Sequence, residues 1–272
     1  MAQPRSKSRT ELFPLTPRLL DVRAVRRITP RMIRVTLGGD QLAGFRTANF
    51  ADHVKLWFPD EETGAHVLPE LDGDGRVGNF RAPGVIFRDY TVRGYDDARQ
   101  TLDIDFVDHD HGPAGRWAGR AAPGDRIGVL GPRGTVHVPT GADYYIIAAD
   151  ETALPAAARW LEELPRDARV FAFLEVADSG EEQPIDAPAG AAVTWLHRGT
   201  AAPGTTGILE AAVRALPLPE GDGFAWAAGE ALSLKPIRRH FKDLGFAKDD
   251  GYEVDGYWRR GTVNLDHHED DD

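Results

Sequence analysis

Cysteine is absent from this chain of 272 residues. Its absence excludes disulfides, iron–sulfur clusters, thiolate metal sites and cysteine nucleophiles. Long hydrophobic runs are missing too: no run approaches the ~18 apolar residues of a membrane span. The first eighteen residues carry five charged side chains and no apolar signal segment. From these absences we expect a cytoplasmic protein that is not inserted in a membrane.

Positive charge is also scarce. Lys and Arg number 32 against 43 Asp and Glu, which gives a formal net charge of −11. This is the wrong sign for a general nucleic-acid surface, so any basic site must be local.

Two motifs are missing as well. No G-x-G-x-x-G follows a strand and no H-E-x-x-H occurs, so neither the ordinary dinucleotide fingerprint nor direct iron ligation by the protein is indicated.

Gly and Pro are abundant, at 48 of the 272 residues. This abundance predicts many turns and short strands. Residues 17–139 contain six strand-like runs between turns, and in Thr101 to Val107 the side chains of Leu102, Ile104 and Phe106 alternate as in a half-buried antiparallel strand. We therefore predict a six-stranded antiparallel β-barrel over 17–139.

The pattern changes after Pro139. Buried or alternating strands are expected at 144–149, 169–176, 192–196 and 223–228, with helices at about 153–164, 208–216 and 231–241. Strands that alternate with helices predict a doubly wound parallel α/β domain over 140–262. Residues 1–16 are expected to be a flexible tail, and 263–272 an acidic disordered tail.

A barrel followed by an α/β sheet offers two ligand-binding surfaces and favours a two-ligand reaction. The sharpest motif is Arg88-Asp89-Tyr90-Thr91. In a strand Arg88 and Tyr90 share one face, where they can offer a cation to a phosphate and a ring to a flat cofactor. An ordinary barrel strand is the alternative for this segment alone.

A second segment follows about twenty residues later. His109 precedes a Gly112-Pro113-Ala114 turn that leads into a short helix containing Trp117. Free N–H groups at the start of such a helix can bind a pyrophosphate. Together the two segments predict a flavin site.

Seven runs then carry a resemblance: RDYTVRGYD, DIDFVDHDHGPAGRWA, GDRIGVLGPRG, ADETALPA, WLHRG, AGEA and GYWRRG. In this order, over roughly residues 17–262, the chain resembles the siderophore-interacting proteins, which are flavin-dependent ferric-siderophore reductases of the ferredoxin-reductase-like superfamily. The resemblance implies an FAD-binding barrel, an NAD(P)H-binding α/β domain, and electron transfer to ferric iron held by a siderophore.

The resemblance also implies roles for individual residues. Arg88 would contact FAD phosphate, Tyr90 would lie against the isoalloxazine, and Thr91 would hydrogen-bond the ring edge. The other residues expected at the flavin are His109, Gly112, Pro113, Ala114, Trp117, Asp150 and Thr152.

The acidic turn Asp150-Glu151-Thr152 raises a difficulty. Carboxylates at a helix N-terminus repel phosphate, so these acids can equally be capping residues. For NAD(P)H the candidates are His197, Arg198, Gly229 and Glu230, at the ends of two strands. Arg198 slightly favours NADPH over NADH, although an Arg that pairs with a carboxylate is equally possible.

No catalytic acid or base is required, because the flavin would divide a hydride into two single-electron steps. An anionic ferric siderophore needs local cations in an acidic protein, and Lys55, Arg133 and Arg259 are the candidates. Two alternatives stay open: a general or ferredoxin-fed flavin reductase, and a non-catalytic siderophore-binding protein.

Overall fold

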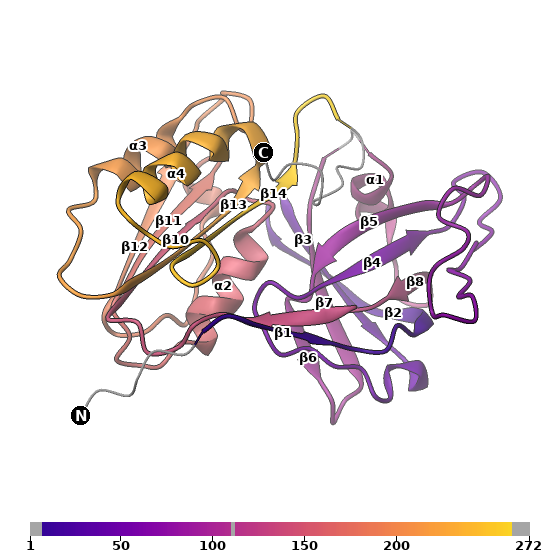
Figure 1. Ribbon diagram of the computed structural model, residues 1–272. Coiled ribbons are helices and arrows are strands. Elements are labelled where there is room, and N and C mark those ends of the chain that lie inside the picture. The colour runs from indigo at the N-terminus through magenta and orange to yellow at the C-terminus, as the bar shows by residue number, and fades with distance from the viewer. Residues whose placement is uncertain (1–6, 110–111, 263–272) are drawn as a thin grey trace. The chain divides into compact units, whose positions relative to one another are not determined.

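The computed structural model describes residues 7–109 and 112–262. The chain divides into two compact units, of which one is Thr10–His137 and the other comprises the remaining described residues (Figure 1). Each unit has its own sheet and its own hydrophobic core. The acidic tail expected at 263–272 lies outside the described residues.

The first unit is built on a seven-stranded sheet with the order β5-β4-β8-β2-β3-β7-β6, in which neighbouring strands are antiparallel. The strands are β2 (Pro17–Thr29), β3 (Met32–Gly38), β4 (His53–Phe58), β5 (Ile86–Thr91), β6 (Gly94–Asp96), β7 (Thr101–Val107) and β8 (Arg126–Leu130). Helix α1 (Pro113–Arg120) and the short helix η1 (Asp40–Leu42) belong to the same unit.

Alternating apolar side chains place one face of these strands in the barrel core. Leu102, Ile104 and Phe106 of β7 are fully buried, as the sequence predicts, and Trp117 of α1 joins them. The sheet has seven strands and not six, because the run from Arg88 to Tyr95 is divided at Val92 and Arg93. The Val92 N–H donates to the Asp52 carbonyl and the Arg93 N–H to the Asp103 carbonyl, so the chain changes partners there.

A small second sheet forms where a tail was expected. Strand β1 (Arg9–Leu12) lies beside β9 (Gly134–His137). The Phe13 N–H donates to the Arg133 carbonyl at 2.8 Å, and the Glu11 carboxylate contacts both Arg46 (2.6 Å) and His137 (3.1 Å). These contacts join residues far apart in the sequence, so the local pattern did not reveal the strand.

The second unit is a five-stranded parallel sheet with the order β12-β11-β10-β13-β14. Its strands are β10 (Tyr144–Ala149), β11 (Val170–Val176), β12 (Ala191–His197), β13 (Gly223–Glu230) and β14 (Tyr252–Trp258). Its helices are α2 (Leu154–Glu163), η2 (Ser179–Glu181), α3 (Ile208–Ala215) and α4 (Ala231–Asp243). The last strand, β14, was not predicted.

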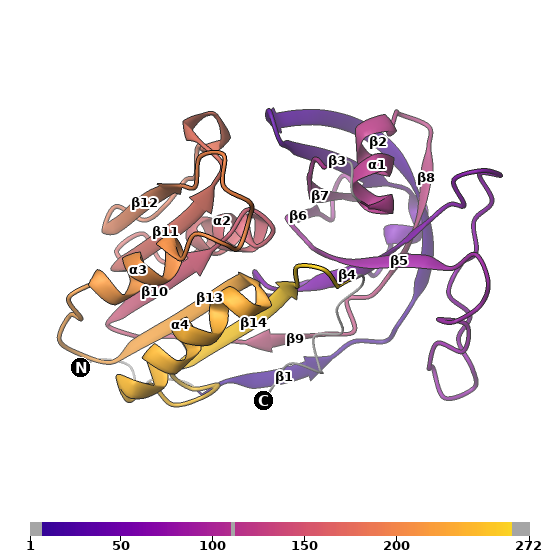
Figure 2. The same cartoon turned by 90° about the horizontal axis from the view of Figure 1, so that it is seen from above.

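Helices cover both faces of this parallel sheet (Figure 2). On one face, α3 and α4 pack against Tyr144, Ile146 and Ala148 of β10. On the other, the α2 ring of Trp160 meets Tyr145 at 5.6 Å between centroids. Every residue of β10 is buried, which explains its unbroken apolar run. The fold is the predicted doubly wound arrangement.

The strand order reverses between β10 and β13. From β10 the chain moves outward to β11 and β12, and α3 then carries it back to β13 on the other side of β10. In open α/β sheets ligands bind outside the carboxyl ends of the strands at such a switch point. Asp150 and Glu230 stand at these two strand ends.

Candidate functional site

Strand β5 brings Arg88 and Tyr90 to one face of the barrel sheet. Their partners across the strand pair are Leu56 and Val54 of β4, and both of these are fully buried. Opposite residues in neighbouring strands share a face. Arg88 and Tyr90 therefore lie on the core side, as the alternation predicts, and Thr91 on the other side is 7% exposed.

The Tyr90 ring packs against Phe106, with centroids 4.4 Å apart. Burial raises the pKa of the Tyr90 phenol, and the positive charge of Arg88 partly opposes this. The phenol is therefore neutral under physiological conditions and can donate a hydrogen bond. The two side chains are neighbours on one face of β5.

Arg88 is a partly buried cation without a carboxylate partner among the described residues. Burial lowers the pKa of its guanidinium, and Nη1 donates to the Phe87 carbonyl at 2.6 Å. Arginine nevertheless stays charged in proteins. A partly dehydrated guanidinium with donors to spare is well suited to bind a phosphate.

Helix α1 supplies the second part of this site. It begins at Pro113 directly after Gly112, and no side chain caps its first turn. Such an end offers backbone N–H groups and the positive end of the helix dipole to an anion. Ala114, the next residue, is buried.

The exposed residue His109 packs against the start of α1 with both its carbonyl group and its ring. A Cβ on Gly115 would lie 2.2 Å from the His109 carbonyl oxygen, so only glycine allows this approach. Trp117 is a core residue: its ring meets Phe58 at 5.8 Å and Phe106 at 5.7 Å. The expected flavin contacts of His109 and Trp117 stay predictions, and Trp117 supports α1 from inside the barrel.

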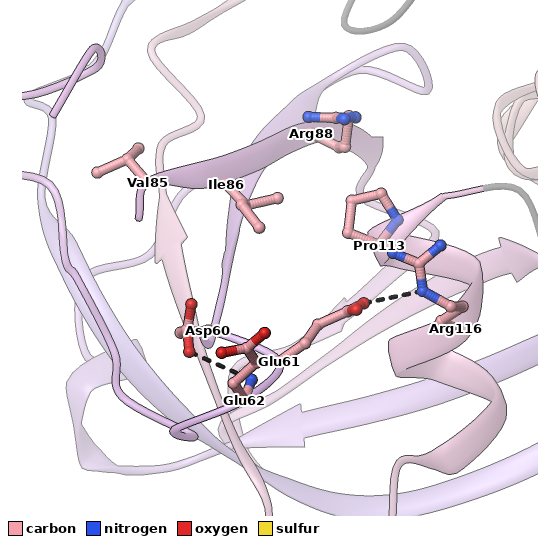
Figure 3. Close-up of a pocket in the computed structure, with 8 residues that line it drawn as sticks. All are labelled: Asp60, Glu61, Glu62, Val85, Ile86, Arg88, Pro113 and Arg116. Carbon is pink, nitrogen blue, oxygen red and sulfur yellow. Dashed lines mark hydrogen bonds and ion pairs between the residues drawn. The ribbon is translucent and has the colours of Figure 1, made fainter. Parts of the chain in front are cut away.

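A pocket of about 490 Å³ lies between β5 and α1. It brings together Arg88 and Pro113, which come from the two motifs singled out in the sequence (Figure 3). The other lining residues are Asp60, Glu61, Glu62, Val85, Ile86 and Arg116. Sequence reasoning missed Arg116, although its position three residues after Pro113 places it on the same side of the helix. No sequence motif pointed to Glu61, which forms an ion pair with Arg116, 55 residues further along the chain.

In the α/β unit, the Asp150 carboxylate occupies the switch point. Its Oδ1 accepts hydrogen bonds from the Thr152 N–H (2.8 Å), the Thr152 hydroxyl (2.6 Å) and the Ala153 N–H (3.3 Å). Its Oδ2 accepts from the Glu230 N–H (2.9 Å) and from Trp258 Nε1 (2.8 Å). Burial raises the pKa of Asp150, and hydrogen bonds from Thr152, Trp258 and Ala153 oppose this rise. Both oxygens thus bind groups of their own unit.

Gly229 and Glu230 complete this arrangement. Gly229 has φ +148°, and a Cβ there would lie 2.5 Å from Asp150 Oδ2. Glu230 is 2% exposed, and its carboxylate accepts from the Ser233 N–H (2.7 Å), where it caps α4, and from the Arg260 N–H (3.1 Å). Gly229 is therefore needed for the close approach of Asp150. Glu230 links the start of α4 to the segment at Arg260 through its two hydrogen bonds. A role of either residue toward NAD(P)H stays a prediction.

Arg198 pairs with a carboxylate, which is the alternative that the sequence left open. Its two Nη atoms donate to both oxygens of Glu151, at 2.5 and 2.6 Å, and its side chain is 3% exposed. Burial, followed by the charge of Asp150, raises the pKa of Glu151 to about 7, although Arg198 opposes this. The same two causes raise the pKa of Glu175, a buried acid that the sequence analysis did not single out.

His197 is a more exposed residue at the same edge. Its Nε2 lies 2.8 Å from Glu182 Oε1. A contact of His197 with NAD(P)H stays a prediction.

The three expected siderophore contacts lie in different surroundings. Lys55 is on the opposite face of the sheet from Arg88, where its Nζ contacts both oxygens of Asp89 at 2.8 and 2.9 Å. The Arg133 side chain is exposed, and Arg259 of the α/β unit is partly buried. Arg133 is thus the more accessible of the two candidates in the barrel unit.

No helix in the part of the chain that the structure describes is long and apolar enough to cross a membrane. Within the same residues no three His, Asp or Glu side chains are grouped so that they could hold a metal ion.

Two family models match this chain. Residues 21–136 match the siderophore-interacting FAD-binding domain, and residues 142–261 match the siderophore-interacting protein model. Among curated relatives, a ferric vibriobactin reductase of Vibrio cholerae is 36% identical, and the match covers 93% of each chain. An NADPH-dependent ferric-chelate reductase of Escherichia coli is 35% identical over 83% of this chain and 86% of its own.

Solved structures agree with these matches. A siderophore utilization protein from T. fusca is 63% identical, with a TM-score of 0.94 over 96% of this chain and 100% of its own. A ferredoxin NADP+ reductase from Neisseria gonorrhoeae, 16% identical, has a TM-score of 0.60 over 90% of this chain and 100% of its own. The latter similarity shows a shared ferredoxin-reductase-like fold. These similarities confirm the barrel and the α/β unit that the resemblance implied.

Proposed function

This chain belongs to the siderophore-interacting protein family, and we propose that it is an FAD-dependent ferric-siderophore reductase that takes its electrons from NADPH or NADH. The names of its relatives support this activity, since they describe reductases of ferric vibriobactin and of ferric chelates. The iron is substrate and arrives already held by a siderophore.

The pocket between β5 and α1 is the observation that carries the proposal. A guanidinium without an ion pair among the described residues and an uncapped helix N-terminus face the same space, and these donors fit a cofactor pyrophosphate. Three acids, Asp60, Glu61 and Glu62, line the same pocket and oppose this binding. When bound, FAD supplies the redox chemistry by accepting a hydride and releasing single electrons. In this proposal Arg88 and the turn Gly112-Pro113-Ala114 bind the pyrophosphate, and Tyr90 and Thr91 position the ring.

We propose that NAD(P)H binds at the carboxyl edge of the parallel sheet. The contacts of Asp150 and of the Glu151–Arg198 pair occupy the place where related folds receive a pyrophosphate, so we expect weak binding of the dinucleotide. Arg198 can bind the 2′-phosphate of NADPH only when that phosphate replaces Glu151. Because we expect the dinucleotide to bind weakly, reduced ferredoxin is the second candidate for the electron donor.

The ferric siderophore is proposed to be an anionic chelate attracted by local cations. Of the candidates Lys55, Arg133 and Arg259, we expect Arg133 to contribute most, since it is exposed while Lys55 is already neutralised by Asp89. A cytoplasmic location stays a prediction from the sequence.

The flavin site is tested by the absorbance spectrum and FAD content of the purified protein. The wild type should be yellow, and Arg88→Ala should lose a charge-assisted phosphate contact worth ~1.5 to 3 kcal/mol, or about 10- to 150-fold in FAD affinity. Arg88→Lys, which keeps the charge, is the matched control and should lose less. A colourless wild type that binds a ferric siderophore favours the non-catalytic binding protein, and full FAD retention by Arg88→Ala after extensive dialysis shows that the site is misassigned.

The electron donor is tested on the FAD-loaded protein under argon. NADPH, NADH and reduced ferredoxin are added separately, and the loss of flavin absorbance is followed. The proposal expects bleaching by a nicotinamide cofactor. Bleaching by reduced ferredoxin alone establishes the ferredoxin-fed reductase instead.

A further inference from the structure

Charges of opposite sign line the pocket of the FAD-binding domain. Arg88 comes from β5 and Arg116 from α1, whereas Asp60, Glu61 and Glu62 come from the turn after β4. Figure 3 shows Arg88 at the top of the view and the three acids at the bottom, with Arg116 reaching toward Glu61. A phosphate that binds the arginines therefore approaches a wall that repels it.

Arg116 needs a negative partner where it stands. It lies in the first helical turns, where side chains lean toward the N-terminus and where the helix dipole disfavours a cation. Glu61 provides this partner: its Oε1 accepts from Arg116 Nε at 2.9 Å. The two side chains are 42% and 37% exposed, so their pair is weak and can exchange partners.

Glu61 is presented to Arg116 by an ordered turn. Asp60 Oδ1 accepts hydrogen bonds from the Glu62 N–H at 3.2 Å and from the Thr63 N–H at 2.8 Å. Hydrogen bonds from Thr63 hold the pKa of Asp60 below its usual range. Asp60 is thus engaged within the turn, and Glu61 is the acid that reaches across the pocket.

We propose that Glu61 competes with the pyrophosphate of FAD for Arg116. In the free protein the ion pair holds Arg116, and on cofactor binding Arg116 exchanges Glu61 for a phosphate oxygen. Arg116 is then a second FAD-binding cation beside Arg88, and Glu61 weakens retention of the cofactor. This inference rests on the proposed function, because it assumes that the pocket receives FAD.

The test is a set of FAD titrations on the full chain after removal of bound flavin, read by quenching of FAD fluorescence. Glu61→Gln should bind FAD about fivefold tighter, the upper range for release of an exposed ion pair. Arg116→Ala should bind FAD at least tenfold more weakly than the wild type, because it loses a charge-assisted phosphate contact. In the Arg116→Ala background, Glu61→Gln should bring no more than the small gain of removing one repelling charge, since no cation is left to release.

Two controls separate competition from general charge removal. Glu62→Gln removes the same charge from the same wall without breaking an ion pair among the described residues, so its gain should be much smaller than that of Glu61→Gln. Riboflavin carries the flavin ring without phosphate, and its affinity should not change in Glu61→Gln. Equal gains in Glu61→Gln and Glu62→Gln, a gain from Glu61→Gln that stays about fivefold in the Arg116→Ala background, or equal gains for riboflavin and FAD would each overturn the competition.

Failure of the inference can be told apart from failure of the proposed function. If the wild type binds FAD and Arg88→Ala weakens it while Glu61→Gln changes nothing, the flavin site stands and the competition is wrong. If the folded wild type does not bind FAD, both are wrong. Circular dichroism of each variant checks that the fold is retained.

Discussion

Replacement of Glu151 by Gln should change how the stability of the fold depends on pH. Burial and the charge of Asp150 raise the pKa of Glu151 from 4.5 to about 7, against the opposing effect of Arg198. Between these two pH values the folded chain binds more protons than the unfolded chain. Glu151 therefore makes the free energy of unfolding fall as pH rises through this window. A carboxylate whose pKa is lowered by folding has the opposite effect: it makes the free energy of unfolding rise with pH.

The size of the effect follows from the shift. Each pKa unit corresponds to ~1.4 kcal/mol, so the shift from 4.5 to about 7 corresponds to about 3 kcal/mol. The Glu151 side chain is only 14% exposed, so solvent screening reduces this little. Gln cannot ionise and resembles the protonated acid in shape. The free energy of unfolding of Glu151→Gln minus that of the wild type should therefore rise by about 3 kcal/mol between pH 4.5 and pH 8.

Urea denaturation at four or five pH values, followed by tryptophan fluorescence and circular dichroism, measures this difference. Glu163→Gln is the matched control, because it removes a 47% exposed carboxylate from the end of α2. Its difference from the wild type should stay within ~1 kcal/mol over the range. A difference for Glu151→Gln that is flat, or that falls as pH rises, would show that Arg198 outweighs burial and Asp150.

Three further outcomes are expected. Gly229→Ala should destabilise the fold by about 2 to 4 kcal/mol in urea denaturation, because its Cβ would meet the Asp150 carboxylate; a loss below ~0.5 kcal/mol would refute the need for glycine. Arg198→Ala should lower stability by about 1 to 3 kcal/mol, because Glu151 loses its partner but can take up a proton. In the folded enzyme it should also raise KM for NADPH more than for NADH, and equal effects on both KM values would leave Arg198 purely structural. The double variant Lys55→Ala, Arg133→Ala should be oxidised more slowly by an anionic ferric siderophore, and the rate should depend less on salt, while the FAD content stays unchanged. Arg133→Ala alone should give most of this effect. Unchanged rates would show that these cations are not the docking site.

Patterns within short stretches of sequence predicted the strands and the helix start that are set by neighbouring residues. The apolar run 144–149 predicted a strand buried on both faces, because the centre of a parallel sheet leaves no exposed side. The alternation in β5 correctly put Arg88 and Tyr90 on one face. The turn before Pro113 correctly predicted a helix start beside them.

Contacts between distant residues were beyond the reach of those patterns. Strand β14 carries acids such as Glu253 between its apolar residues, so its sequence resembles an exposed segment. In the fold β14 pairs with β13 at the edge of the sheet, and burial, aided by Asp255 and Asp249, raises the pKa of Glu253 to about 8. The bond from Trp258 to Asp150 spans 108 residues, and no spacing in the sequence announces it.

The proposed function requires that this protein passes electrons from a nicotinamide cofactor through FAD to a ferric siderophore. The direct measurement is anaerobic double-mixing stopped flow, in which the FAD-loaded protein meets NADPH and then a ferric siderophore, with a ferrous-specific chelator present. We expect bleaching of the flavin absorbance, its return on the second mixing, and about two captured ferrous ions for each NADPH, since a flavin divides a hydride into single electrons. Flavin that is reduced by NADPH but stays bleached in the presence of the ferric siderophore, with no ferrous iron captured, would contradict it.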